Sequence, residues 1–133
     1  MGHDERGEFL YRYVSDCYYA EGGDTDELME IGTLYAAKFD ADGTGTWLSL
    51  TPETTVMKQG MIRIHMRLAT SSLGVTTMDR AEWMTAIPLK AEVYCALTIN
   101  KNCGLKPNSG RDKTSVGGPN PREASNYGQN FRW

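Results

Sequence analysis

Two strand-like segments joined by a tight turn most constrain the fold of this 133-residue chain. Residues 33–39 (TLYAAKF) and 45–50 (GTWLSL) carry the β-branched and aromatic residues typical of strands. Between them, DADGTG contains Asp-Gly and a second Gly, which supply the positive φ angles that a tight hairpin needs. The sequence therefore predicts an antiparallel hairpin over residues 33–50.

The same turn has a second interpretation, because Asp40, Asp42 and Thr44 resemble the first ligands of an EF-hand calcium loop. The twelfth position counted from Asp40 is Thr51, where an EF-hand requires Glu. The flanking segments are also strand-like, whereas an EF-hand loop lies between helices. These two departures favour the hairpin turn.

Further strands are predicted over residues 9–19, 91–99 and 127–133, and an acidic loop with one short turn over residues 21–32. Residues 51–73 change to a helical period and predict one helix, entered through Thr51 and Pro52. Its apolar face would consist of Val56, Met57, Met61, Ile64 and Leu68. Residues 100–126 are dense in Asn, Gly, Pro and Ser and predict a long loop. The predicted fold class is mostly β or α+β.

Length and composition indicate one ordinary globular domain over residues 1–133, with 40% hydrophobic and 23% charged residues. The chain has no apolar run long enough for a membrane helix, and its charged N-terminus predicts no signal peptide and a cytoplasmic location. The net charge of -3 conceals an asymmetry: residues 1–53 hold twelve acids and three bases, and residues 54–133 hold five acids and eleven bases. Overall acidity argues against nucleic acid as a partner, whereas the two oppositely charged parts could attract each other within or between chains.

Cysteine and histidine offer little chemistry by themselves. Cys17, Cys95 and Cys103 are odd in number and form no Cys-x-x-Cys pair, so neither a disulfide framework nor a structural zinc site is expected. His65 lies in the predicted helix with no nearby His or Cys, which favours a surface or partly packed histidine over a metal ligand.

Residues 78–83 (MDRAEW) form the main candidate site. In an extended segment, Arg80 and Glu82 point to the same face because side chains alternate. A carboxylate beside a guanidinium suits a site for a hard cation and a phosphate ester. The alternative is an ion network of Asp79, Arg80 and Glu82 on a solvated turn, and spacing alone favours that alternative.

Five motifs in order carry a resemblance to a known family: MGHDERGEFLYRYVSD, GTLYAAKFDADGTGTWLSL, TTMDRAEWMTAIP, AEVYCALTIN and GGPNPREASNYGQNFRW. The chain resembles the PhoX-type alkaline phosphatases, a bacterial family of calcium- and iron-dependent phosphomonoesterases with a β-propeller fold. The resemblance runs nearly end to end and implies a domain similar to the C-terminal part of such an enzyme. At that size, it implies an incomplete, propeller-like set of antiparallel strands with one helix and one long loop.

Carried over by position, the resemblance implies that Glu82 and Glu5 are metal ligands and that Arg80 is the catalytic phosphate contact. It implies Asn100 as a second substrate-binding residue. The sequence departs from the family pattern at Ala81, where the family has Pro, at His3, where it has Asp, and at Ile99, where it has Asn.

These features predict a truncated or divergent PhoX-like relative without independent catalysis, which retains weak metal or phosphate binding and acts as an oligomeric binding module. The alternative is an active metal-dependent phosphomonoesterase whose site is completed across subunits. Calcium is the expected cofactor, and iron is not expected, because the cysteine-bearing segment of the family is missing from this sequence. The expected partners are a second copy of the chain and a phosphate-bearing small molecule, with no membrane; the family itself is typically exported.

Overall fold

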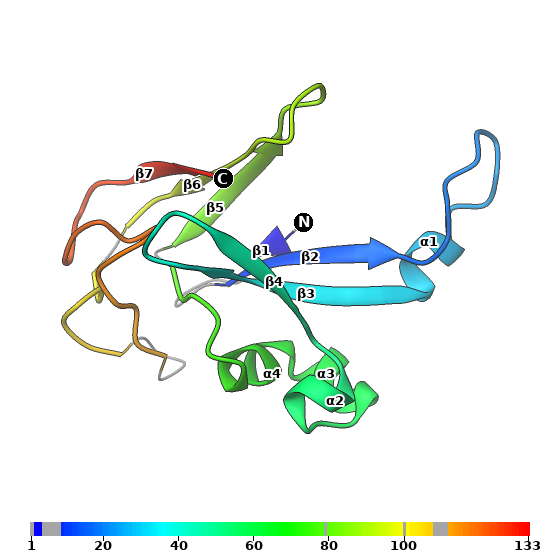
Figure 1. Ribbon diagram of the computed structural model, residues 1–133, viewed down its shortest axis with the longest axis horizontal. Coiled ribbons are helices and arrows are strands. Elements are labelled where there is room, and N and C mark those ends of the chain that lie inside the picture. The colour runs from blue at the N-terminus through cyan, green and yellow to red at the C-terminus, as the bar shows by residue number, and fades with distance from the viewer. Residues whose placement is uncertain (1, 4–8, 79, 100, 108–111) are drawn as a thin grey trace.

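The computed structural model describes residues 2–3, 9–78, 80–99, 101–107 and 112–133, with only the backbone for residues 2–3. Two antiparallel sheets dominate the described part of the chain, and short helices lie beside them (Figure 1). The elements in chain order are β1 (Gly2–His3), β2 (Leu10–Ser15), α1 (Glu27–Glu30), β3 (Gly32–Phe39), β4 (Gly45–Ser49), α2 (Pro52–Thr55), α3 (Gln59–Ile64), α4 (Met66–Ser72), β5 (Ala81–Ala86), β6 (Val93–Leu97) and β7 (Gln129–Arg132).

The first sheet has the strand order β1-β2-β3-β4, and the predicted hairpin is its β3–β4 pair. At the turn, the Asp40 amide donates to the Thr44 carbonyl at 2.9 Å, and Gly43 adopts a φ of 88°. The Asp42 carboxylate accepts hydrogen bonds from the amide and hydroxyl of Thr44 at 2.9 and 2.7 Å. The hairpin interpretation of this segment is confirmed, since its carboxylate is used within the turn itself.

The second sheet has the order β5-β6-β7. Strands β6 and β7 confirm the predictions over 91–99 and 127–133, although both are shorter than predicted. Between them, the described part of the long loop contains no helix and no named strand. Gly117 and Asn120 form an isolated bridge, and Ser125 is also a bridge residue.

The prediction of one helix over residues 51–73 is wrong, because this segment forms the three short helices α2, α3 and α4. The first break is at Val56, which has a φ of 60° and ends α2; the second is at His65, with φ -117° and ψ 44°. Each break rotates the next helix, so the predicted apolar face does not stay on one side. Met57 remains partly buried, but Val56 is 94% exposed and Ile64 73% exposed.

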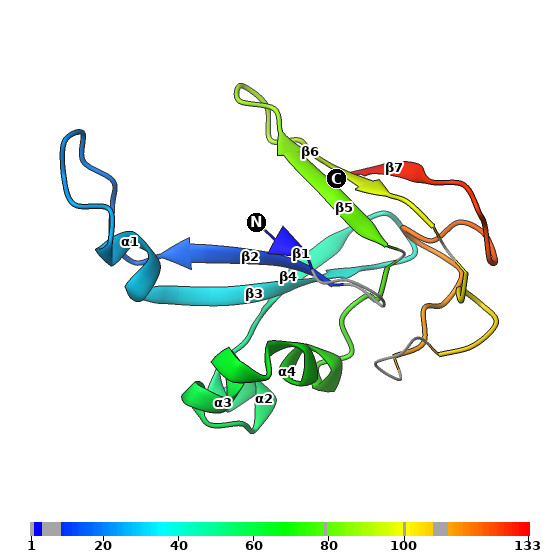
Figure 2. The ribbon, with the colours of Figure 1, turned by 180° about the vertical axis from the view of Figure 1, so that it is seen from behind.

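Two apolar clusters hold the molecule together. The first joins one face of the four-stranded sheet to the helices through Phe9, Tyr11, Ala36, Leu50, Ile62, Ala69 and Val75. The second joins the opposite face to the three-stranded sheet through Leu10, Ala37, Met78, Ala81, Cys95 and Leu97. Successive residues of β2 and β3 alternate between the two clusters, as the pleat requires. Figures 1 and 2 show the resulting layers: helices, four-stranded sheet, three-stranded sheet.

No disulfide joins Cys17, Cys95 and Cys103 to one another, and Cys95 and Cys103 are buried. No helix in the described ranges is long and apolar enough to cross a membrane.

Candidate functional site

Arg80 and Glu82 lie at the start of β5, where the chain enters the three-stranded sheet. Met78 and Ala81 are buried in the cluster between the sheets, with 1% and 2% exposure. Arg80 and Glu82 are partly exposed instead, and Arg80 Nε lies 3.0 Å from Glu82 Oε1. The contact is an ion pair by distance, without the alignment of a good hydrogen bond. The predicted juxtaposition of these two side chains is confirmed.

A β-bulge shapes this pair. Ala81 pairs with Leu97 and Trp83 pairs with Ala96, so Glu82 is the extra residue between two adjacent rungs of the ladder. A bulge redirects the side chains around it and locally increases the twist of the strand. The side chain of Glu82 is 32% exposed, and Trp83 beside it is 78% exposed. The bulge therefore presents a carboxylate and an indole next to each other at the sheet edge.

The backbone of Arg80 is held by Thr98 across the ladder. The Thr98 amide donates to the Arg80 carbonyl at 2.7 Å, and the Thr98 hydroxyl lies 3.4 Å from the same oxygen. Thr98 also lines an open cleft of about 500 Å³ at the end of β6, together with residues of the chain entering β7, among them Gly128 and Gln129. The backbone of Arg80 is thus hydrogen-bonded to a residue that lines this cleft.

A buried amide supports the segment leading to Arg80. Asn120, 1% exposed, donates from Nδ2 to the Thr77 carbonyl at 2.9 Å. Its own backbone is fixed by reciprocal hydrogen bonds with Gly117, at 2.8 and 3.0 Å. The sequence analysis did not identify this role, although the Gly-Gly-Pro-Asn run at 117–120 is a turn signal that could have pointed to it.

The family model described as Alkaline phosphatase PhoX matches residues 1–133. The chain belongs to the PhoX family. A solved structure, "Pseudomonas fluorescens PhoX in complex with vanadate, a transition state analogue", is similar to it with 40% sequence identity and a TM-score of 0.81. The similarity covers 98% of this chain and 24% of that one, so this chain spans about a quarter of the length of the solved PhoX. No curated protein sequence is significantly similar to it.

The PhoX relationship confirms the resemblance carried by the five motifs. It also identifies the type of fold to which the two sheets belong. Two antiparallel sheets packed face to face, with few helices, form a partial propeller-like β fold. Glu82 lies in β5, the first strand of the second sheet of this PhoX-like unit, and Arg80 directly precedes that strand.

The other two residues implied by the PhoX resemblance, Glu5 and Asn100, lie outside the described residues. Asp79 of the MDRAEW motif does so as well. The neighbour of Asn100, Ile99, lines the cleft at the end of β6 together with Thr98. The assignments of Glu5, Asn100, Arg80 and Glu82 to metal and phosphate therefore stay predictions.

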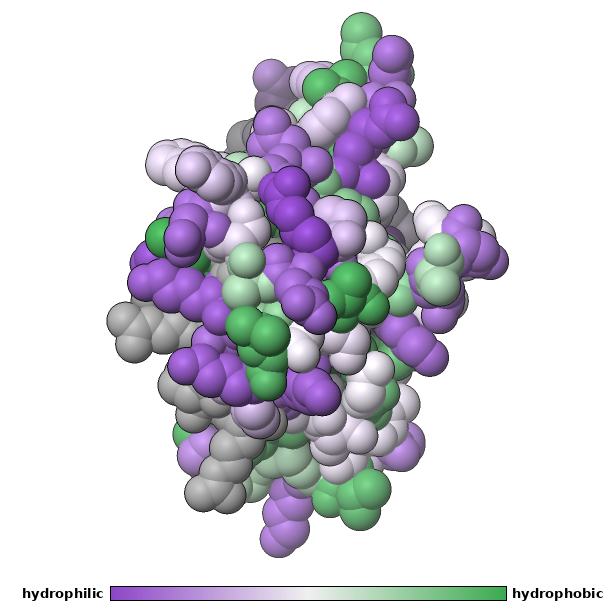
Figure 3. All heavy atoms as spheres, turned by 90° about the vertical axis from the view of Figure 1, so that its left-hand side faces the viewer, coloured by the Kyte–Doolittle hydropathy of each residue, from purple (hydrophilic) through white to green (hydrophobic). Residues whose placement is uncertain are grey.

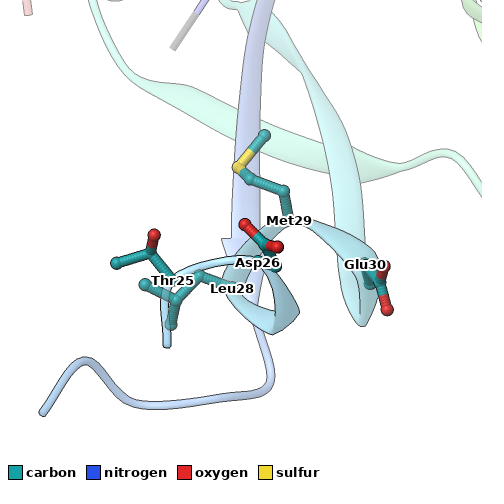
Figure 4. Close-up of a pocket in the computed structure, with 5 residues that line it drawn as sticks. All are labelled: Thr25, Asp26, Leu28, Met29 and Glu30. Carbon is teal, nitrogen blue, oxygen red and sulfur yellow. The ribbon is translucent and has the colours of Figure 1, made fainter. Parts of the chain in front are cut away.

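Glu82 alone does not make a calcium site, because calcium takes six to eight oxygen ligands in proteins. Within the described ranges, no three His, Cys, Asp or Glu residues converge in a way that could hold a metal ion. This includes the acidic loop, where Asp26 and Glu30 border a hollow on α1 beside Leu28 and Met29 (Figure 4). His65 is exposed, as expected of a surface histidine. Of the predicted PhoX-type site, the described residues thus contain one carboxylate, that of Glu82, and one guanidinium, that of Arg80.

Proposed function

We propose that this PhoX-family chain binds phosphate-bearing small molecules through Arg80, with Glu82 at its side, and does not turn them over independently. The observation that carries the proposal is the Arg80–Glu82 ion pair of 3.0 Å at the β5 bulge. An arginine fork matches the oxygens of a phosphate monoester in shape and charge. A neighbouring carboxylate orients the guanidinium, and the Thr98 contacts fix the backbone beneath it.

Glu82 has a second proposed role, as a ligand for calcium shared with Glu5 and with groups from elsewhere. A carboxylate that faces a cation on one side retains lone pairs for a second cation. Asn100, next to the cleft-lining Ile99, is the proposed second contact to the ligand. When bound, calcium would neutralise phosphate charge beside Arg80. Iron is not part of the proposal.

The solved Pseudomonas fluorescens PhoX is in complex with vanadate, a transition state analogue. Vanadate and phosphate share a tetrahedral oxyanion form, so a similar oxyanion is the proposed ligand class here. The alternative proposal is an active phosphomonoesterase, with a site completed across subunits. The charge asymmetry of the sequence is the feature that favours association between copies.

The first experiment measures binding of inorganic phosphate and of vanadate by calorimetry, with and without calcium. Arg80→Gln removes the charge while keeping a polar side chain, and we expect its affinity to fall about tenfold or more, as for loss of a charge-assisted contact. Arg63→Gln, an exposed arginine on α3, is the matched control and should bind like the wild type. Equal affinity of wild type and Arg80→Gln would refute the phosphate-binding proposal.

The second experiment separates binding from catalysis. We expect no hydrolysis of p-nitrophenyl phosphate by the purified chain, with calcium or with ferric iron. Turnover that disappears in both Arg80→Ala and Glu82→Ala would instead support the active, subunit-completed alternative. Turnover that persists in these variants would come from another site or from a contaminant, and would count against both forms of the proposal.

A further inference from the structure

Trp83 is a large side chain of the sheet edge that the proposed phosphate contact leaves unused. It is 78% exposed, whereas Trp47 and Trp133, the other two tryptophans of the chain, are partly buried against the cluster between the sheets. A single exposed hydrophobic residue is normal by itself, so its neighbours decide whether it has a role. Trp83 has a charged pair beside it, because it directly follows Glu82, which contacts Arg80 at 3.0 Å.

The register of the three-stranded sheet defines the face to which Trp83 belongs. Trp83 pairs with Ala96, and Ala96 pairs with Asn130, so these three side chains form a row across β5, β6 and β7. Ala81 lies on the opposite face, where it is buried in the cluster between the sheets. Arg80 directly precedes Ala81, and side chains alternate between faces, so Arg80 is directed to the same face as Trp83.

The β5 bulge brings Arg80 and Trp83 to one face. In a regular strand, residues three positions apart point to opposite faces, because the side-chain period is two. Glu82 is the extra residue between two adjacent rungs of the ladder, and it shifts the alternation by one position from Trp83 onward. The bulge therefore places a guanidinium and an indole ring on the same open face.

An open cleft of about 500 Å³ borders this face at the end of β6, and Ala96, Thr98 and Asn130 are among its lining residues. Thr98 also holds the Arg80 backbone, through an amide that donates to the Arg80 carbonyl at 2.7 Å. Since Thr98 and Ala96 are two residues apart, Arg80 and Trp83, which lie across from them, are separated by roughly 7 Å along the sheet. A small phosphate ester can therefore contact both side chains.

The charge around this face favours an anionic ligand. Residues 83–133, which include β6, β7 and the loop between them, contain seven Lys and Arg residues and three Asp and Glu residues. Figure 3 views the end of the molecule where β6 ends and β7 begins, and the hydrophobic residues described there are scattered among hydrophilic ones. This surface composition suits a small anion with one apolar group better than an extended apolar partner.

We propose that Trp83 selects phosphate monoesters that carry an aromatic ring, by stacking on that ring while Arg80 holds the phosphate. This inference rests on the proposed phosphate binding and adds the class of ester. Two aromatic rings in offset or edge-to-face contact gain free energy beyond the area that they bury. An aryl phosphate therefore makes the same contact to Arg80 as inorganic phosphate does, and adds the contact to the indole ring.

The test compares three probes by calorimetry with the full chain: inorganic phosphate, phenyl phosphate and cyclohexyl phosphate. We expect the wild type to bind phenyl phosphate about tenfold more tightly than inorganic phosphate, with cyclohexyl phosphate between them. In Trp83→Leu, which keeps an apolar side chain without a ring, this preference should fall to about twofold or less. Trp83→Phe should retain most of it. Tyr18→Leu, at an aromatic residue 97% exposed in the segment between β2 and β3, is the matched control and should retain the wild-type preference.

Circular dichroism must show that every variant retains the wild-type fold. Phosphate binding without a preference for phenyl phosphate, or a preference that Trp83→Leu retains, would overturn the role of Trp83 and leave the phosphate-binding proposal in place. An equal gain from cyclohexyl phosphate would overturn the selection of an aromatic ring. If the wild type binds none of the three probes, the phosphate-binding proposal and this inference both fail.

Discussion

The two sheets of this PhoX-family chain are covered in different ways. The four-stranded sheet is packed on both faces, by the helices on one side and by the three-stranded sheet on the other. The three-stranded sheet is packed on one face, and Trp83 of its edge strand β5 is 78% exposed. Arg80 and Glu82 lie at the start of that same edge strand. The fully covered sheet contributes to both apolar clusters, and the half-covered sheet leaves Arg80, Glu82 and Trp83 accessible to solvent.

The largest expected effect tests whether both sheets belong to one folding unit. Leu50, in the cluster beneath the helices, and Leu97, in the cluster between the sheets, are each 2% exposed. Leu50→Ala and Leu97→Ala should each lower the free energy of unfolding by about 2–5 kcal/mol, because each leaves a cavity in a packed core. Urea unfolding followed by circular dichroism measures the loss.

If the sheets are coupled, both variants shift a single transition. Two separate transitions in Leu97→Ala, one of them at the wild-type midpoint, would show that the four-stranded sheet stands without its neighbour. Leu89→Ala, at a residue 96% exposed, is the control and should change stability by less than about 0.5 kcal/mol.

The next effect concerns how closely the chain entering β7 approaches β6. A Cβ added at Gly128 would lie 2.5 Å from the Leu97 carbonyl oxygen and 3.0 Å from that of Thr98. Gly128→Ala should therefore destabilise the three-stranded sheet by about 1–3 kcal/mol, the range for a side chain that does not fit. It should also disturb Thr98 and, through it, the backbone of Arg80.

Gly60→Ala is the matched comparison, because no atom lies within 4 Å of its added Cβ and the residue is in α3. It should stabilise the chain by about 0.5–1 kcal/mol, from the higher helix propensity of Ala. Thermal unfolding of the two variants measures both changes in stability: the midpoint should fall for Gly128→Ala and rise for Gly60→Ala. A neutral Gly128→Ala would mean that β7 can move away from β6 without cost.

Local signals predicted the strands well. The hairpin over 33–50 depends on residues that are adjacent in sequence, namely two strand-like segments and a turn rich in Asp and Gly between them. Local sequence alone is therefore enough to predict it. The prediction of one helix over 51–73 was wrong, because the spacing of apolar residues carries no information about the backbone breaks at Val56 and His65. Val56 is β-branched and adopts a positive φ at the C-terminal cap of α2, a conformation that its propensity does not favour.

The candidate site was predictable only in part, for the same reason. Arg80 and Glu82 are two residues apart, so strand alternation brings them together. Thr98 contacts Arg80 from 18 positions along the chain, and Asn120 contacts Thr77 from 43 positions along the chain. Residue spacing in the sequence cannot reveal contacts over such separations. The pairing of the sheets and the folding of the long loop determine those contacts.

The smallest expected effect lies in the turn of the fully covered sheet. Hydrogen bonds from the hydroxyl and then the amide of Thr44 lower the pKa of Asp42 below its ordinary value of 3.8. Because the pKa is lower in the folded state, the ionised carboxylate stabilises the fold above the unfolded pKa, and this contribution is lost as the pH falls through the folded pKa. The stability difference between wild type and Asp42→Ala should therefore be constant near neutral pH and shrink in acid.

Urea unfolding of both proteins across the acidic range measures that difference. Asp42→Asn is the informative control, since its side-chain carbonyl can still accept from Thr44 but does not ionise in this range. It should retain part of the turn's stability and show no titration of its own. A wild-type advantage over Asp42→Ala that is unchanged at the lowest pH would mean that the carboxylate charge is irrelevant to the hairpin. The advantage would then come from the hydrogen bonds that the uncharged Asp42 side chain still accepts from Thr44.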